Sequence, residues 1–136
     1  YGNDGAGISI GECDGVTVKN NLVFGNSSRW GTGPQITAWS SSHITSDYNL
    51  LSPPDSGLPE GPHSITIADD AVWRSHNGGL VIGLARRDLH LAPSSPAIDK
   101  GADLSATGIT CDIDGTPRPQ GKGWDIGAYE WKSAAR

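Results

Sequence analysis

The chain has 136 residues, with 19 glycines, 9 prolines and a formal net charge of −5. This length allows one domain with a single sizeable core, and the composition favours turns and short strands over helices. The sequence has no basic cluster beyond Arg86-Arg87 and no apolar run of about 20 residues, so we expect neither a nucleic-acid partner nor a membrane span. Tyr1–Gly5 is typical of a turn, and we expect the chain to be a piece of a longer, processed protein.

The first half of the chain contains a repeat with an offset of 28 residues. Five pairs share this offset: Ile8 and Ile36, Ile10 and Ala38, Val16 and Ile44, Asn21 and Asn49, and Leu22 and Leu50. Apolar and polar residues alternate within each copy, which is the period of a strand. Three short strands per copy are typical of a parallel β-solenoid, whose coils stack because none buries its apolar face alone. A weaker third copy is predicted to start at Ser64.

Asn21 and Asn49 occupy the same place in the two copies, directly after a strand. We expect each at a tight corner, because Asn tolerates left-handed backbone angles. Stacked side-chain amides at this corner would bond from coil to coil as an asparagine ladder. The proline-rich stretch Ser52–Pro62 and the stretch Ser75–Gly83 are predicted to be loops.

Several motifs resemble a known family. Residues 7–51 resemble two coils of a right-handed parallel β-helix of the pectate-lyase-like superfamily, with Val16–Asn26 similar to its second strand, asparagine corner and third strand. Asp88–Gly101, Asp112–Pro119 and Asp125–Glu130 resemble the C-terminal segment of secreted bacterial β-helix proteins. The resemblance implies an all-β fold: a right-handed parallel β-helix, as a short solenoid of about three rungs with an irregular C-terminal cap.

The predicted organisation has three parts within one structural domain. Residues 1–73 form the β-helix rungs, residues 74–93 form a loop and the last rung strand, and residues 94–136 form the C-terminal cap. We expect the cap to close one end of the solenoid. Its apolar residues are predicted to be buried against the last rung: Ile98, Ile113, Ile126 and Tyr129.

The outward positions of the first strand in each copy suggest a carbohydrate-binding face. Strand alternation places Trp39 outward, and the stretch around Trp30 is expected to overhang the same face. Exposed aromatic rings with a cation beside them suit a sugar ring and its carboxylate. The alternative is that Trp39 packs beneath Ser52–Pro62 and Trp30 covers the rung edge. The predicted carbohydrate-binding residues are Arg29, Trp30, Thr37 and Trp39.

Two acidic pairs raise the question of calcium, because calcium prefers carboxylate oxygens. The pairs are Asp69-Asp70 and Asp112/Asp114, and Asp112-x-Asp114-Gly115 is only a fragment of a calcium loop that lacks the distal bidentate Glu. We therefore interpret these aspartates as turn formers that cap local N–H groups, with Arg118 pairing with Asp125 or Asp114. No cofactor and no metal site are predicted, and calcium is the alternative.

The cysteines and histidines show no recognisable site pattern. Cys13 and Cys111 form no disulfide framework or zinc motif, so we interpret them as separate core residues, with pairing in an oxidising compartment as the alternative. The histidines lack metal-ligand spacing and are expected to be solvated or structural: His43, His63, His76 and His90.

The predicted outward rung positions carry too few carboxylates and basic groups for lyase or hydrolase chemistry. Catalytic residues are therefore left unassigned, and we expect those of any enzymatic parent upstream of Tyr1. The resemblance implies the terminal module of a secreted or cell-surface protein that associates with polysaccharide. A self-associating structural or adhesive subunit is the alternative, with another copy or the rest of its precursor binding at the open N-terminal end. Plain carbohydrate binding through Trp30 and Trp39 is a third possibility.

Overall fold

The computed structural model describes residues 5–26, 33–68, 81–83 and 88–133. The chain forms two compact units, which we call unit 1 (Tyr1–Asp70) and unit 2 (Ala71–Arg136). In the described parts of the chain the regular structure is almost entirely β, as predicted. None of the helices found there is long and apolar enough to cross a membrane. The division at 1–73, 74–93 and 94–136 stays a prediction.

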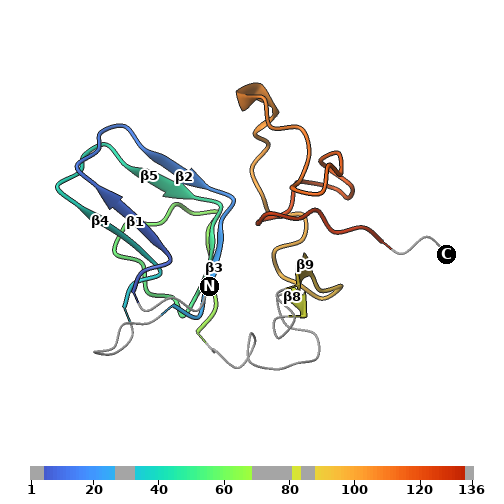
Figure 1. Ribbon diagram of the computed structural model, residues 1–136, viewed down its shortest axis with the longest axis horizontal. Coiled ribbons are helices and arrows are strands. Elements are labelled where there is room, and N and C mark those ends of the chain that lie inside the picture. Colours follow the sequence, from blue (N-terminus) through green and yellow to red (C-terminus); the bar gives the residue numbers. More distant parts are fainter. Residues whose placement is uncertain (1–4, 27–32, 69–80, 84–87, 134–136) are drawn as a thin grey trace. The chain divides into compact units, whose positions relative to one another are not determined.

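Unit 1 consists of short parallel strands stacked like rungs (Figure 1). The first coil contributes β1 (Ile8–Gly11), β2 (Thr17–Lys19) and β3 (Leu22–Phe24), and the second contributes β4 (Ile36–Trp39), β5 (Thr45–Asp47) and β6 (Leu50–Ser52). A short β7 (Ile65–Thr66) follows. The strand orders are β1-β4, β2-β5 and β3-β6-β7, which is consistent with a short β-solenoid.

The predicted 28-residue offset is the register of all three faces. Ile8 pairs with Ile36, Thr17 with Thr45, and Leu22 with Leu50. Alternation along the strands places a buried cluster inside the coils, made of Ile10, Val18, Val23, Ile36 and Leu51. Each such side chain contributes about 1.5–3 kcal/mol by leaving water, so the stacked coils share one core.

The corners repeat with the same offset, but the predicted role of the asparagines there is wrong in part. Residues with positive φ occur in pairs at Glu12 and Ser40, Gly15 and His43, and Asn20 and Tyr48. Asn20 and Tyr48 stand one position before the ladder asparagines, so the preceding residue takes the left-handed angle. Asn21 and Asn49 instead use their side chains to bond between coils.

The asparagine ladder itself is confirmed. The Asn49 side chain is fully buried, and its Oδ1 accepts hydrogen bonds from the backbone N and the Nδ2 of Asn21, both at 3.0 Å. Its Nδ2 donates to the Val18 carbonyl and to Ser46 Oγ, also at 3.0 Å. One buried amide therefore satisfies polar groups of both coils at this corner.

The third coil begins earlier than predicted. Isolated parallel bridges join Ile36 to Ser56 and Ser46 to Glu60, both within the stretch predicted to be a loop. Ile65 lies opposite Leu50 on the third face, so the copy predicted from Ser64 is not a first strand. The register step falls from 28 residues to 20 (Ile36 to Ser56) and 15 (Leu50 to Ile65), which leaves room only for brief pairing.

The inner side of the third coil is polar around the carboxylate of Glu60. Its Oε1 accepts hydrogen bonds from Ser46 Oγ at 2.6 Å and Ser56 Oγ at 3.1 Å. Its Oε2 accepts from Ser64 Oγ at 2.7 Å and Asn49 Nδ2 at 3.2 Å. Four donors therefore satisfy this carboxylate where the apolar core of the first two coils ends.

Unit 2 contains little regular structure. Strand β8 (Val81–Gly83) pairs antiparallel with β9 (Asp88–Leu91), and a 3-10 helix, η2, spans Ser105–Thr107. Carboxylates accept backbone N–H groups from residues 4 to 26 positions away: Asp99 from Gly123, Asp112 from Thr116 and Glu130, Asp125 from Asp99 and Trp131, and Glu130 from Gln120. These contacts substitute for a strand ladder.

Arg118 lies at the centre of these contacts, and its predicted carboxylate partners are wrong. Its Nη1 donates to Glu130 Oε2 at 3.1 Å and to the Asp125 carbonyl at 3.0 Å. Its Nη2 donates to the Gly127 carbonyl at 2.8 Å. The ion-pair partner is therefore Glu130, whose carboxylate also accepts the backbone N–H of Gln120, whereas the Asp125 carboxylate accepts the backbone N–H groups of Asp99 and Trp131.

Three burial predictions are wrong. Both cysteines are exposed and unpaired: Cys13 follows the corner at Glu12, with its Sγ 2.9 Å from the Gly11 carbonyl oxygen. Ile113 is 70% exposed, because the Asp112–Gly115 turn directs it outward, whereas Ile126 is fully buried. Ile98 and Tyr129 are half-buried. Position on a corner or turn therefore overrides the usual burial of Cys and Ile.

Candidate functional site

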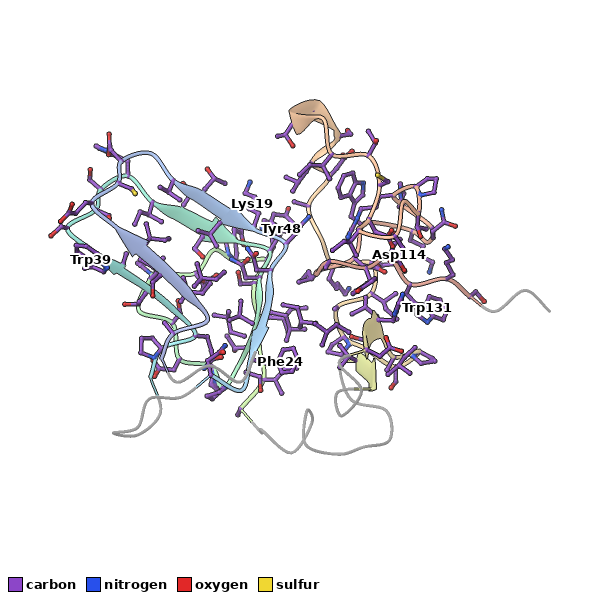
Figure 2. All side chains as sticks on the ribbon, viewed as in Figure 1. Lys19, Phe24, Trp39, Tyr48, Asp114 and Trp131 are labelled. Carbon is purple, nitrogen blue, oxygen red and sulfur yellow. The ribbon has the colours of Figure 1, made fainter. Side chains whose placement is uncertain are left out.

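Trp39, the last residue of β4, presents an aromatic ring on the β1–β4 sheet (Figure 2). Its cross-strand partner is Gly11, and a Cβ atom on Gly11 would overlap the indole ring. The ring therefore lies on bare backbone. With 56% of its surface exposed, Trp39 is not covered by the Ser52–Pro62 stretch, which was the alternative placement.

The rest of this face follows the predicted alternation. Ser9 is exposed and its partner Thr37 is half-buried, while Ile10 and Ile36 are buried. Thr37 and Trp39 therefore lie on one face, with Ser9 beside Thr37. Arg29 and Trp30 lie outside the described residues, so their predicted place beside this face stays a prediction.

An exposed corner of unit 1 brings together Asp14, Ser42 and His43. Asp14 Oδ1 accepts a hydrogen bond from Ser42 Oγ and lies 2.6 Å from His43 Nδ1. The hydrogen bond from Ser42, followed by that from His43, lowers the pKa of Asp14. Ser42 contacts the carboxylate rather than the imidazole, so this trio lacks the serine-to-base contact that activates a nucleophile.

A second corner stacks side chains from all three coils. Asp47 accepts backbone N–H groups from Tyr48 and His63 at 2.9 Å, and its Oδ2 lies 2.8 Å from His63 Nδ1. The rings of Tyr48 and His63 stack at 4.3 Å, and Lys19 Nζ lies 5.8 Å from the Tyr48 centroid. Burial raises the pKa of Asp47, but hydrogen bonds led by that of His63 outweigh it and lower the pKa overall. These contacts fasten the third coil to the second.

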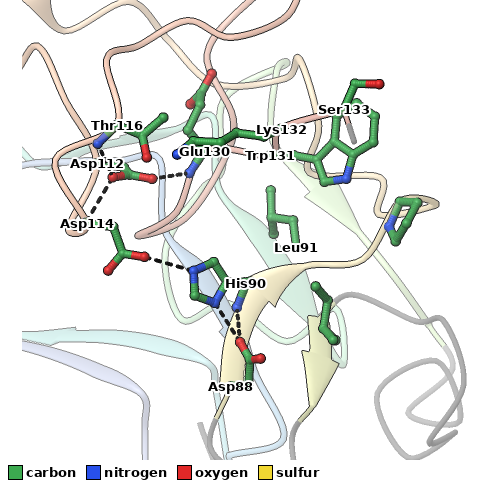
Figure 3. Close-up of a pocket in the computed structure, with 12 residues that line it drawn as sticks. Asp88, His90, Leu91, Asp112, Asp114, Thr116, Glu130, Trp131, Lys132 and Ser133 are labelled. Atoms are coloured by element: carbon green, nitrogen blue, oxygen red, sulfur yellow. Dashed lines mark hydrogen bonds and ion pairs between the residues drawn. The ribbon is translucent and has the colours of Figure 1, made fainter. Parts of the chain in front are cut away.

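Unit 2 contains a hollow of about 590 Å³ (Figure 3). Strand β9 supplies Asp88, His90 and Leu91 to its lining, and further residues come from β8, from Pro93, from the stretch Asp112–Thr116 and from the final described residues. Its apolar lining consists of Ile82, Leu91, Pro93 and Trp131, and its polar lining includes Asp88, His90, Asp114, Thr116 and Lys132.

His90 bridges two carboxylates in this hollow. Its Nδ1 lies 2.6 Å from Asp88 Oδ1 and its Nε2 lies 2.9 Å from Asp114 Oδ2, while its ring packs on Tyr129 at 4.1 Å. The hydrogen bonds with Asp88 and then Asp114 raise the pKa of His90, and the His90 contact lowers that of Asp88. The group therefore favours an imidazolium between two carboxylates.

The Asp112–Gly115 turn shows what its aspartates do. Asp112 Oδ1 accepts the backbone N–H groups of Asp114 at 2.9 Å and Thr116 at 2.7 Å, and its Oδ2 accepts that of Glu130 at 2.9 Å. Asp112 is a turn former, as the sequence indicates. Within the described residues, no group of three or more His, Cys, Asp or Glu side chains could hold a metal ion. Asp69-Asp70 and His76 lie outside those residues.

The contacts of His90 with Asp88 and Asp114, which we call the His90 group, were not predicted from the sequence, although the sequence indicates one of them. Asp88 and His90 stand two positions apart on a strand, which places their side chains on one face. Asp114 comes 24 residues later, from an irregular turn, and no local pattern announces that contact.

No protein-family model, curated protein or solved structure matches this chain. The functional assignment therefore rests on the stacked strands of unit 1, the Trp39 face and the hollow of unit 2.

Proposed function

We propose that this chain is a terminal module of a right-handed parallel β-helix protein, similar to the pectate-lyase-like superfamily, that binds polysaccharide on its β1–β4 sheet. The observation that supports this most is the exposed Trp39 ring lying on Gly11. The 28-residue register and the asparagine ladder are typical of that architecture and support the proposed fold. A secreted or cell-surface location is part of the proposal.

The physical basis is a flat aromatic surface beside hydroxyl groups. One face of the Trp39 indole covers the Gly11 backbone, so its opposite face is available to the C–H groups of a sugar ring. Thr37, two residues earlier, offers a hydroxyl on the same side of the strand, and Ser9 adds another from β1. We retain Arg29 and Trp30 as contributors on the sequence evidence, with Arg29 suited to a uronate carboxylate.

The proposed role is binding and end-capping rather than catalysis. The outward residues described on the β1–β4 sheet are Ser9, Gly11, Thr37 and Trp39, which include no acid or base. From these four residues a glycan would meet stacking and hydroxyl contacts, with Arg29 as the proposed charged contact. Catalytic groups would come from other parts of a longer protein.

Binding to pectin, alginate, xylan and cellulose, measured by affinity electrophoresis and pull-down, tests this proposal. We expect one of these glycans to bind, Trp39→Ala to weaken that binding about tenfold, or about 1.4 kcal/mol, and Trp39→Phe to preserve most of it. Ile113→Ala, which truncates an exposed apolar residue of unit 2, is the matched control and should change nothing. Unchanged affinity of Trp39→Ala for the glycan would exclude the Trp39 platform, by which we mean the exposed Trp39 ring on the β1–β4 sheet.

Self-association is a second candidate, supported by the sheet edges. Each of β1, β2 and β3 is the end strand of its sheet among the residues that the structure describes. Such edges pair readily with another chain, here the rest of a precursor or a second copy. Sedimentation velocity over a wide range of concentrations tests the second copy. Growth in size with concentration supports it, and a stable monomer throughout would contradict it.

A further inference from the structure

The hollow of unit 2 has two unlike sides (Figure 3). The Trp131 ring lies on one side with Leu91, and the His90 group of Asp88 and Asp114 lies on another. Ile82, which also lines the hollow, is 57% exposed. A ligand that offers both an apolar surface and hydrogen-bond donors matches such a lining.

The polar side keeps acceptors available. Asp88 uses Oδ1 for both of its contacts with His90, to the backbone N at 3.1 Å and to Nδ1 at 2.6 Å. Asp114 uses Oδ2 for His90 Nε2. Asp88 Oδ2 and Asp114 Oδ1 accept no hydrogen bond from any residue that the structure describes, and their side chains are 40% and 54% exposed. Both oxygens can therefore accept from hydroxyl groups.

The charges around the hollow favour an uncharged ligand. His90 as an imidazolium and Lys132 balance the carboxylates of Asp88 and Asp114. The remaining acids, Asp112 and Glu130, direct their carboxylates to backbone N–H groups and to Arg118, and Tyr129 packs on the His90 ring. Among the side chains free to contact a ligand, the two carboxylates and the two cations therefore balance, which favours neither a cation nor an anion.

We propose that this hollow binds one residue of a neutral saccharide, at a site separate from the Trp39 platform. The C–H face of the sugar packs on Trp131, with Ile82 at its edge, and its hydroxyl groups donate to Asp88 Oδ2 and Asp114 Oδ1. The volume of about 590 Å³ lies within the range of roughly 300–1,000 Å³ that is typical of small-molecule sites. Because Trp39 belongs to unit 1, variants separate the two sites.

Titration of the isotope-labelled full chain with maltotriose and cellotriose, followed by amide NMR, tests the site. We expect saturable shifts at Leu91, Trp131 and Lys132 with at least one of the two. Asp114→Ala and Trp131→Leu should each weaken binding about tenfold, and Ile82→Ser about threefold. Asp103→Ala, whose exposed carboxylate in unit 2 does not line the hollow, is the control and should leave the affinity unchanged.

Further outcomes keep this proposal distinct from the function proposed for unit 1. Trp39→Ala should leave these trisaccharide shifts intact even where it abolishes polysaccharide binding. Ile82→Ser changes an exposed side chain, so it tests the site even if Trp131→Leu fails to fold. The absence of saturable shifts, saturation by glucosamine or galacturonate but by neither neutral trisaccharide, or unchanged affinity in both Ile82→Ser and Asp114→Ala would overturn the proposal.

Discussion

Unit 1 and unit 2 provide hydrogen-bond partners for their backbone groups in different ways. In unit 1, parallel strands bond to their copies 28 residues away, and the asparagine ladder satisfies the corner. In unit 2, the carboxylates of Asp112, Asp125 and Glu130 accept hydrogen bonds from many of the backbone N–H groups. Unit 1 is therefore stabilised by repetition, whereas unit 2 depends on particular side chains.

This difference determines how each unit responds to change. A repeating coil distributes its backbone bonds over many equivalent positions, so the loss of one contact stays local. In an irregular segment with buried charges, each charged group depends on its own ion-pair partner. Removing that partner leaves an unpaired buried charge, which is strongly destabilising. Single substitutions at polar centres should therefore be more damaging in unit 2 than in unit 1.

Arg118→Met should produce the largest effect. The guanidinium and the Glu130 carboxylate have side chains only 6% and 0% exposed, so removing Arg118 strands a buried charge. We expect a loss of about 3–5 kcal/mol in the free energy of unfolding of unit 2. Urea unfolding followed by hydrogen exchange in each unit measures it, with Lys122→Met as the exposed control.

A second substitution tests whether the unpaired carboxylate of Glu130 causes this loss of stability. Burial raises the pKa of Glu130 even with Arg118 present, so a neutral side chain fits there better than an unpaired carboxylate. Glu130→Gln added to Arg118→Met should therefore recover part of the lost stability. A double variant that is less stable than Arg118→Met would show that the stranded charge is not the cause.

Asn49→Ala and Asn21→Ala form a matched pair in unit 1, with an intermediate effect. Asn49 is fully buried and bonded to both neighbouring coils, so its truncation leaves buried donors and acceptors unsatisfied. We expect it to cost about 2–3 kcal/mol, and the half-buried Asn21 about 1 kcal/mol. Chemical denaturation of both variants checks the ratio. Equal losses would contradict a ladder centred on Asn49.

His90→Gln should produce the smallest effect, seen as a change in pH dependence. Asp88 and Asp114 raise the pKa of His90 in the folded chain above its ordinary value of 6.5. Its stabilising contribution is therefore complete below that value and is lost as pH rises through the folded pKa. The groups are well exposed, so we expect less than about 1 kcal/mol.

The free energies of unfolding of the unsubstituted chain and of His90→Gln, measured from about pH 5.5 to 9, give the contribution of His90. The unsubstituted chain should lose stability relative to His90→Gln as the pH increases through this range. A constant difference between the two proteins, or one of opposite sign, would rule out the bridging imidazolium.

The features predictable from the sequence were those that recur. Ile8, Ile36 and the ladder asparagines repeat at one offset, so the register and the outward position of Trp39 could be read directly. The third coil was misplaced because its bridging residues, Ser56 and Glu60, carry no apolar signal. Their contacts depend on hydroxyl groups gathered around one carboxylate.

The errors in unit 2 and at the corners have a common cause. Whether Ile113 or Cys13 is buried depends on the turn it occupies, and composition does not describe that turn. The pairing of Arg118 with Glu130 depends on how the irregular backbone brings together two residues that are 12 positions apart. Contacts of this kind arise only once the irregular chain has folded, so local sequence patterns do not contain them.

The most direct test of the proposed function follows the indole N–H signals of the five tryptophans while a binding polysaccharide, cut to short oligomers, is added. Trp39→Phe and Trp131→Phe assign the two relevant signals. The Trp39 signal should shift in a saturable manner, because the sugar stacks on the ring that covers Gly11. Saturable binding of the oligomers with an unchanged Trp39 signal would contradict the platform on the β1–β4 sheet.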